Sequence, residues 1–240
     1  MHEPFVLFGT QHLIVIALTF IVPAIFVAVL RLYGRSLDPA IRGFFGALLI
    51  GTWVGWYVLF ISRDWLGLGN EFPMNLCDWA TIALIVTLFR PSQRAFELAY
   101  FWALAGTTQG LVTPDVNFSF PEPQFIVFLL GHGAIIASVI YLIFGSGLRP
   151  VPASIARVTL WTFVYAGAAA LTDWVLGTNY GFFRAKPGHA TFYDLLPAWP
   201  YYIPLTILIG IACVFVLYAP WFVLDMVRKR PAAATSDLTA

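Results

Sequence analysis

The chain has 240 residues, of which 60% are hydrophobic and 10% are charged, and its formal net charge is +1. The mean hydropathy is +0.82. This composition excludes a soluble globular domain, and the dispersed basic residues exclude a nucleic-acid-binding protein, so the sequence predicts an integral membrane protein.

Apolar stretches long enough to cross a bilayer recur along the whole chain. A transmembrane helix needs about 20 predominantly apolar residues. The sequence therefore predicts an all-α, polytopic membrane bundle of seven transmembrane helices over residues 1–230, followed by a disordered cytoplasmic tail, residues 231–240. The predicted spans are residues 12–33, 41–61, 75–89, 95–113, 124–144, 155–176 and 199–226.

Length matters for the interpretation of the first and third spans. The first lacks the basic start and cleavage site of a removable signal peptide and is longer than one, so we expect it to remain as an anchor. The third, residues 75–89, is the shortest of the seven.

Positive charge sorts the loops into two groups and predicts the orientation. The loops expected on one side carry ten Lys and Arg residues, and those on the other side carry three. Cytoplasmic loops of membrane proteins are enriched in these residues. The amino terminus is therefore predicted outside, the carboxyl terminus inside, and the protein in the cytoplasmic (plasma) membrane.

The strongly polar residues gather at the predicted outer ends of the spans. Ionisable groups within membranes usually face the bundle interior or a wet cavity, so we expect an outward-opening cavity. His12, Asp78 and Asp173 have a plain alternative, which is contact with the lipid headgroups. The candidate site residues are His12, Asn75, Cys77, Asp78, Gln109, Asp115, His132, Asp173, Asn179 and Tyr180.

His132 lies deeper, about 12 Å below the outer end of its span at 1.5 Å per residue. Gly131 and Gly133 flank it and would let another helix approach, so a purely structural histidine is the alternative to a functional one.

Cys77 lies in the first turn of the third span. Asn75 is a candidate N-cap, and Asp78 three residues later completes a capping box. The free amides of a helix start favour a thiolate, whereas the negative charge of Asp78 opposes one. A nearby base such as His132 is therefore needed for full activation. Cys213, mid-span among apolar residues, is interpreted as a packing residue.

Several motifs together resemble the YwaF-like integral membrane proteins. The resemblance implies a relation to a eukaryotic transmembrane lipid acyltransferase that uses a cysteine and a histidine. Matched by motif, the nucleophile is Cys77 and the base is His132. The motifs are Asn75-Leu76-Cys77-Asp78, Thr113-Pro114-Asp115, Phe120-Pro121, His132-Gly133, Asn179-Tyr180, Lys186-Pro187 and Trp199-Pro200-Tyr201-Tyr202.

The sequence thus predicts a cofactor-free acyl-transfer enzyme that acts on membrane lipids through Cys77 and His132, with Asp173 or Asp115 orienting the histidine. The runner-up is a small-molecule transporter or ligand-binding protein that uses the same polar cluster. A retinal protein is excluded because the last span contains no lysine.

A metal site is a third hypothesis. His12, His132, Asp115 and Asp173 would have to converge on zinc, although no local ligand spacing of the usual kind is present. His189, in the last predicted outer loop, is interpreted as solvated.

Overall fold

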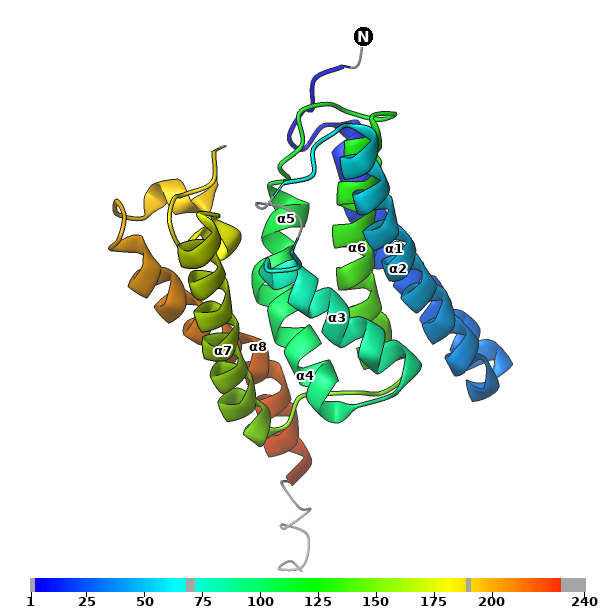
Figure 1. The fold of residues 1–240 in the computed structure, drawn as a ribbon. Helices are drawn as coiled ribbons and strands as arrows, with labels where there is room; N and C mark the ends of the chain where they lie inside the picture. Colours follow the sequence, from blue (N-terminus) through cyan, green and yellow to red (C-terminus); the bar gives the residue numbers. More distant parts are fainter. Residues whose placement is uncertain (1–2, 68–71, 189–190, 230–240) are drawn as a thin grey trace, which may run out of the picture.

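The computed structural model describes residues 3–67, 72–188 and 191–229, and it is helical throughout apart from connecting segments and one isolated bridge between Pro4 and Phe118 (Figure 1). The predicted tail and His189 lie outside the described residues. The helices are α1 (Thr10–Tyr33), α2 (Asp38–Ser62), α3 (Leu76–Phe89), α4 (Gln93–Trp102), α5 (Thr108–Val112), α6 (Pro123–Phe144), α7 (Pro152–Leu176) and α8 (Tyr202–Lys229). The shorter turns are η1 (Arg35–Leu37), η2 (Ala103–Thr107), η3 (Tyr180–Phe182) and η4 (Phe192–Leu195).

The all-α prediction is confirmed for the described residues, and each predicted span contains a helix. Five helices, α1, α2, α6, α7 and α8, are long and apolar enough to cross a membrane. The other two predicted spans correspond to α3 and to the continuous run α4–η2–α5. The protein is therefore a multi-pass membrane protein by helix length and composition.

Local signals explain where the helices begin and end. The Ser92 hydroxyl accepts the Ala95 amide at 3.3 Å, which starts α4 two residues before the predicted span. Pro123 and Pro152 occupy first-turn positions of α6 and α7, where a missing N–H has no consequence. Gly177 ends α7 in the left-handed region at φ 73°.

Helix α3 has 14 residues and is about 21 Å long, too short to cross the hydrocarbon core by itself. Phe72, Pro73 and Asn75, which precede α3, line a cavity between the helices. Irregular backbone at membrane depth is tolerated where protein or a cavity surrounds it. The start of α3 is therefore placed inside the bundle.

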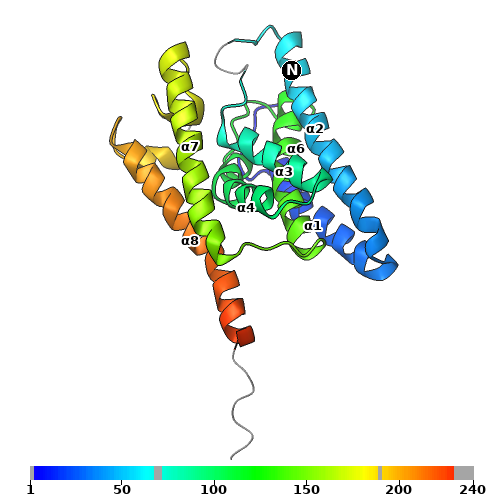
Figure 2. The same ribbon diagram turned by 60° about the horizontal axis from the view of Figure 1, so that its bottom comes forward.

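Helix α6 is the centre of the larger packing unit and contacts α1, α2, α3 and α5. Its buried Tyr141 stacks on Phe45 of α2, with ring centroids 5.4 Å apart. Figures 1 and 2 both show α7 and α8 on the side of the molecule away from α1 and α2. The α7–α8 pair contacts the larger unit mainly through α4 and η2.

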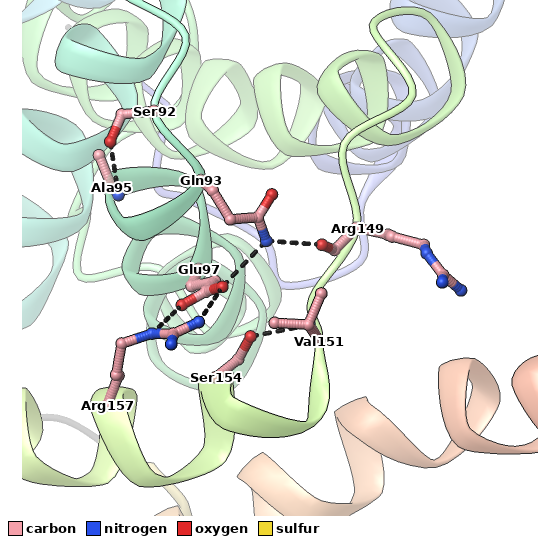
Figure 3. Close-up of polar contacts among 8 residues, drawn as sticks. All are labelled: Ser92, Gln93, Ala95, Glu97, Arg149, Val151, Ser154 and Arg157. Carbon is pink, nitrogen blue, oxygen red and sulfur yellow. Dashed lines mark hydrogen bonds and ion pairs between the residues drawn. The ribbon is translucent and has the colours of Figure 1, made fainter.

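A polar network joins α7 to α4 at the end where both helices begin (Figure 3). The Glu97 carboxylate, 1% exposed, accepts two hydrogen bonds from Arg157, at 2.8 Å from Nε and 2.7 Å from the NH2 nitrogen. Gln93 donates a third at 2.9 Å and also binds the Arg149 carbonyl at 2.8 Å. Such a bidentate pair fixes both distance and orientation, so it anchors one end of α7.

Candidate functional site

A cavity of about 650 Å³ lies between the two packing units. Its walls come from α2, α3, α4, η2, α5, α6, α7, α8 and the segment that carries η3 and η4, and they are mostly apolar. The cavity collects six of the ten predicted site residues, namely Asn75, Cys77, Asp78, Gln109, Asp115 and His132. Helices distant in sequence thus deliver the predicted cysteine and histidine to one space.

Cys77 is half-buried in the first turn of α3. The Asp78 carboxylate accepts the Asn75 amide at 2.9 Å, as the capping-box motif requires. This cap occupies one oxygen of Asp78. The thiol lies at a helix start, where unpaired amides favour negative charge on its sulfur.

The His132 ring has a defined orientation. Its Nδ1 lies 2.9 Å from the Phe128 carbonyl oxygen, and the ring stacks on Phe128 with centroids 4.1 Å apart. A carbonyl oxygen only accepts, so Nδ1 carries the hydrogen, and the neutral ring then has its lone pair on Nε2. Asp115, one of the two carboxylates predicted to orient His132, lines the same cavity, whereas Asp173 lies outside its lining.

Two glycines explain how closely the helices approach. A methyl group on Gly110 would lie 2.5 Å from His132 Nε2, and one on Gly106 would lie 2.7 Å from Leu76 Cδ2. Both distances are too short for any side chain. Gly106 and Gly110 form a G-x-x-x-G motif, which permits such close contacts between membrane helices. One helix therefore packs against the residue beside Cys77 and against His132.

The same helix contains a π-helical stretch, η2, over Ala103–Thr107. Such π-bulges insert an extra residue into a helical turn and are frequent at functional sites. The Thr108 hydroxyl donates to the Leu104 carbonyl at 2.9 Å. The hydroxyl of its neighbour Thr107, which lines the cavity, has no partner in the part of the chain that the structure describes.

The structure places His12 away from the cavity. Its Nε2 lies 2.7 Å from the Leu111 carbonyl, and its Nδ1 accepts the Phe8 amide at 3.1 Å. Both nitrogens are occupied, so the ring fastens α1 to α5. The described residues bring together no group of three or more His, Cys, Asp or Glu that fits a metal, and the convergence considered for zinc is not found.

Asp173, Asn179 and Tyr180 also lie outside the cavity lining and support the wall behind it. One oxygen of Asp173 accepts the Thr178 hydroxyl at 2.7 Å and the Tyr180 amide at 2.6 Å. The Asn179 side chain accepts two backbone amides of the following loop, each at 2.9 Å. The Tyr180 hydroxyl accepts the Phe72 amide at 3.1 Å, which joins this loop to the segment before α3.

Sequence reasoning missed several residues of the wall. Four aromatic residues of α2 line it, Trp53, Trp56, Tyr57 and Phe60. Their i, i+3, i+4, i+7 spacing marks one helix face and was a readable signal. Cys213, interpreted as a packing residue, is half-buried on α8 and also lines the cavity.

Tyr193 in η4 closes part of the wall outside the predicted spans. Burial, together with the neighbouring Tyr202, raises the pKa of Tyr193 to about 12. Its hydroxyl therefore stays protonated and neutral at physiological pH.

These observations define a class, a multi-pass, all-helical integral membrane protein whose helices enclose a largely apolar cavity with a cysteine and a histidine in its wall. The chain belongs to the TMEM164 family, whose family model matches residues 7–218. No curated protein and no solved structure matches the chain.

Proposed function

We propose that the protein is an acyl-transfer enzyme that acts on membrane lipids, with Cys77 as nucleophile and His132 as base. The observation that carries this proposal is that both side chains line the same largely apolar cavity. Its aromatic walls suit an acyl chain, and the polar residues Asn75 and Asp78 flank Cys77 in its lining. The resemblance to YwaF-like proteins, and through them to a lipid acyltransferase, supports the same assignment.

The first half-reaction transfers the acyl group to the enzyme. His132 Nε2 takes the proton of the Cys77 thiol, and the sulfur attacks the carbonyl carbon of a lipid ester. The carbonyl electron pair moves to its oxygen and then returns as the ester C–O bond breaks. The leaving alkoxide takes the proton from His132, which yields an alcohol and a Cys77 thioester.

The second half-reaction reverses these roles. His132 Nε2 takes the proton from the hydroxyl of a second lipid or from water, and that oxygen attacks the thioester carbon. The carbon–sulfur bond breaks, and the thiolate recovers its proton from His132. The products are an acylated acceptor, or a free fatty acid, and the original enzyme.

The proposed setting is the cytoplasmic membrane, with seven spans and the amino terminus outside. The bias of ten basic residues to three supports this orientation. The cavity would then draw its lipid from the outer half of the bilayer. Membrane lipids are the proposed partners, and no cofactor or metal takes part in the reaction.

Thiol reactivity in nanodiscs tests the proposal, because the cavity supplies its own reference. Cys77 and Cys213 line the same space, yet only Cys77 lies at a helix start. Iodoacetamide labelling, followed by mass spectrometry, should modify Cys77 faster than Cys213. His132→Ala should slow Cys77 alone, and Cys77→Ala should abolish acyl transfer from a labelled lipid.

Equal, His132-independent labelling of the two cysteines would rule out the Cys77–His132 pairing. The cavity would then be better explained as a binding or transport site, which uptake measurements would test. Retained lipid turnover in Cys77→Ala would have the same consequence for the enzyme.

A further inference from the structure

Three buried side-chain oxygens among the described residues have no hydrogen-bond partner, namely Thr107 Oγ1, Tyr165 Oη and Asp173 Oδ2. Buried polar groups are nearly always paired, since an unpaired one destabilises the fold. Thr107 and Tyr165 both line the cavity, one from η2 and the other from α7. Two unpaired hydroxyls in one cavity point to a ligand atom that accepts hydrogen bonds.

Aromatic packing holds Tyr165 firmly. Its ring meets the edge of Trp79 at a centroid distance of 5.4 Å and lies 6.5 Å from Trp102. A methyl group on Gly181 would lie 2.7 Å from the Tyr165 hydroxyl oxygen, and Gly181 has a φ of +60° that suits glycine. The hydroxyl therefore reaches across to η3, beside a glycine that itself lines the cavity.

Both residues belong to the same cavity wall as the start of α3. Tyr165 packs in one apolar cluster with Leu76 and Trp79, which flank Cys77 in the sequence, and both Tyr165 and Cys77 line the cavity. Thr107 follows Gly106, the residue that Leu76 contacts. The two unpaired donors and the proposed nucleophile thus belong to one cavity wall, on η2, α7 and α3.

We infer that the Tyr165 and Thr107 hydroxyls bind the carbonyl oxygen of the acyl ester whose carbon Cys77 attacks. This inference rests on the proposed function. As the carbon–sulfur bond forms, the carbonyl electron pair moves to that oxygen, and the two hydroxyls donate hydrogen bonds to it without losing their protons. The pair returns when the ester C–O bond breaks. The ligand class is an uncharged ester carbonyl.

Two probes separate this role from thiol activation. Acylation of Cys77 by p-nitrophenyl decanoate passes through an oxyanion, whereas alkylation by iodoacetamide does not. Tyr165→Phe should slow acylation about 100-fold, the range seen when one oxyanion donor is removed, and should leave alkylation unchanged. His132→Ala should slow both reactions. Both rates are measured by mass spectrometry of the full chain in nanodiscs.

Tyr218→Phe is the matched control, because it removes the same atom from a buried tyrosine of α8 that does not line the cavity. It should change neither rate. Equal acylation of wild type and Tyr165→Phe would overturn the inference alone. A parallel fall in both rates would also overturn it, by assigning the hydroxyl to the thiol or to the fold. Failure of wild-type Cys77 to be acylated would overturn the proposed function, and this inference with it.

Discussion

Helices α4 and α7 contact each other at two places, which differ in whether every buried polar side chain has a hydrogen-bond partner. At one, both oxygens of Glu97 are paired, with Arg157 and Gln93 as donors (Figure 3). At the other, the Trp102 indole donates to the Thr162 hydroxyl at 2.9 Å, but the hydroxyl of neighbouring Tyr165 is buried and has no partner among the described residues. Paired polar groups fix the helices, whereas unpaired ones remain for a ligand. The predictions below would break or sharpen this contrast.

The largest effect is expected in the cavity, from Gly110→Ala. The added methyl group would lie 2.5 Å from His132 Nε2, so the imidazole must move. A displacement of about 1 Å in a catalytic group can cost about 100-fold in rate, and we expect that loss in Cys77 alkylation. Gly51→Ala on α2 is the control, because nothing lies within 4 Å of the added methyl. Equal rates in the two variants would contradict the positioning role of Gly110.

Arg157→Met tests the other meeting point. It leaves the Glu97 carboxylate, 1% exposed, without its main partner. We expect the melting temperature in detergent to fall by roughly 6 °C, at the modest end for a buried pair because Arg157 itself is partly exposed. Arg149→Met should matter less, since its partner Asp225 is 24% exposed. Loss of Cys77 reactivity in folded Arg157→Met would show that the Glu97–Arg157 contact also affects the cavity, and would contradict the contrast.

His12→Phe tests whether the hydrogen bonds of His12 stabilise the fold, as those of Glu97 do. The variant keeps an aromatic ring but removes the hydrogen-bond partner of the Phe8 amide and of the Leu111 carbonyl. The free energy of unfolding should therefore fall by about 2 kcal/mol. Thermal melting measures this loss, and His132→Phe serves as the comparison. Cys77 alkylation should be unaffected in His12→Phe. A tenfold fall would place His12 in the site.

Thr107→Val should give the smallest effect, and it should stabilise the fold, whereas Arg157→Met and His12→Phe destabilise it. It replaces a buried, unpaired hydroxyl with a methyl group of similar size, so the fold should be stabilised by about 1 kcal/mol. Acylation of Cys77 by p-nitrophenyl decanoate should nevertheless fall. Destabilisation in thermal melting would indicate that the hydroxyl has a structural role.

The helices were predictable because each span carries its own signal in length and hydropathy. Cap residues such as Ser92 moved the observed starts by a few residues. The gathering of Asn75, Cys77, Asp78 and His132 in one cavity was predictable because all four lie in the predicted outer halves of their spans.

Local side-chain partners such as the Asn75–Asp78 capping box were predictable, whereas partners from distant helices were not. Both His12 and His132 were candidate site residues, yet one has both nitrogens occupied and the other has a hydrogen bond from Nδ1 alone among the described residues. That difference depends on carbonyl groups that tertiary packing supplies. The π-helical stretch and the unpaired hydroxyls likewise have no local sequence signature. The G-x-x-x-G motif of Gly106 and Gly110, in contrast, can be recognised in the sequence.

The shortness of α3 has an electrostatic consequence. A helix that begins at the membrane surface exposes its first amides to water, which screens their partial positive charge. Helix α3 instead begins beside a largely apolar cavity, where the effective dielectric is lower and the same partial charge acts more strongly. The attraction between an anion formed at Cys77 and the first amides of α3 should therefore depend little on the salt concentration of the medium.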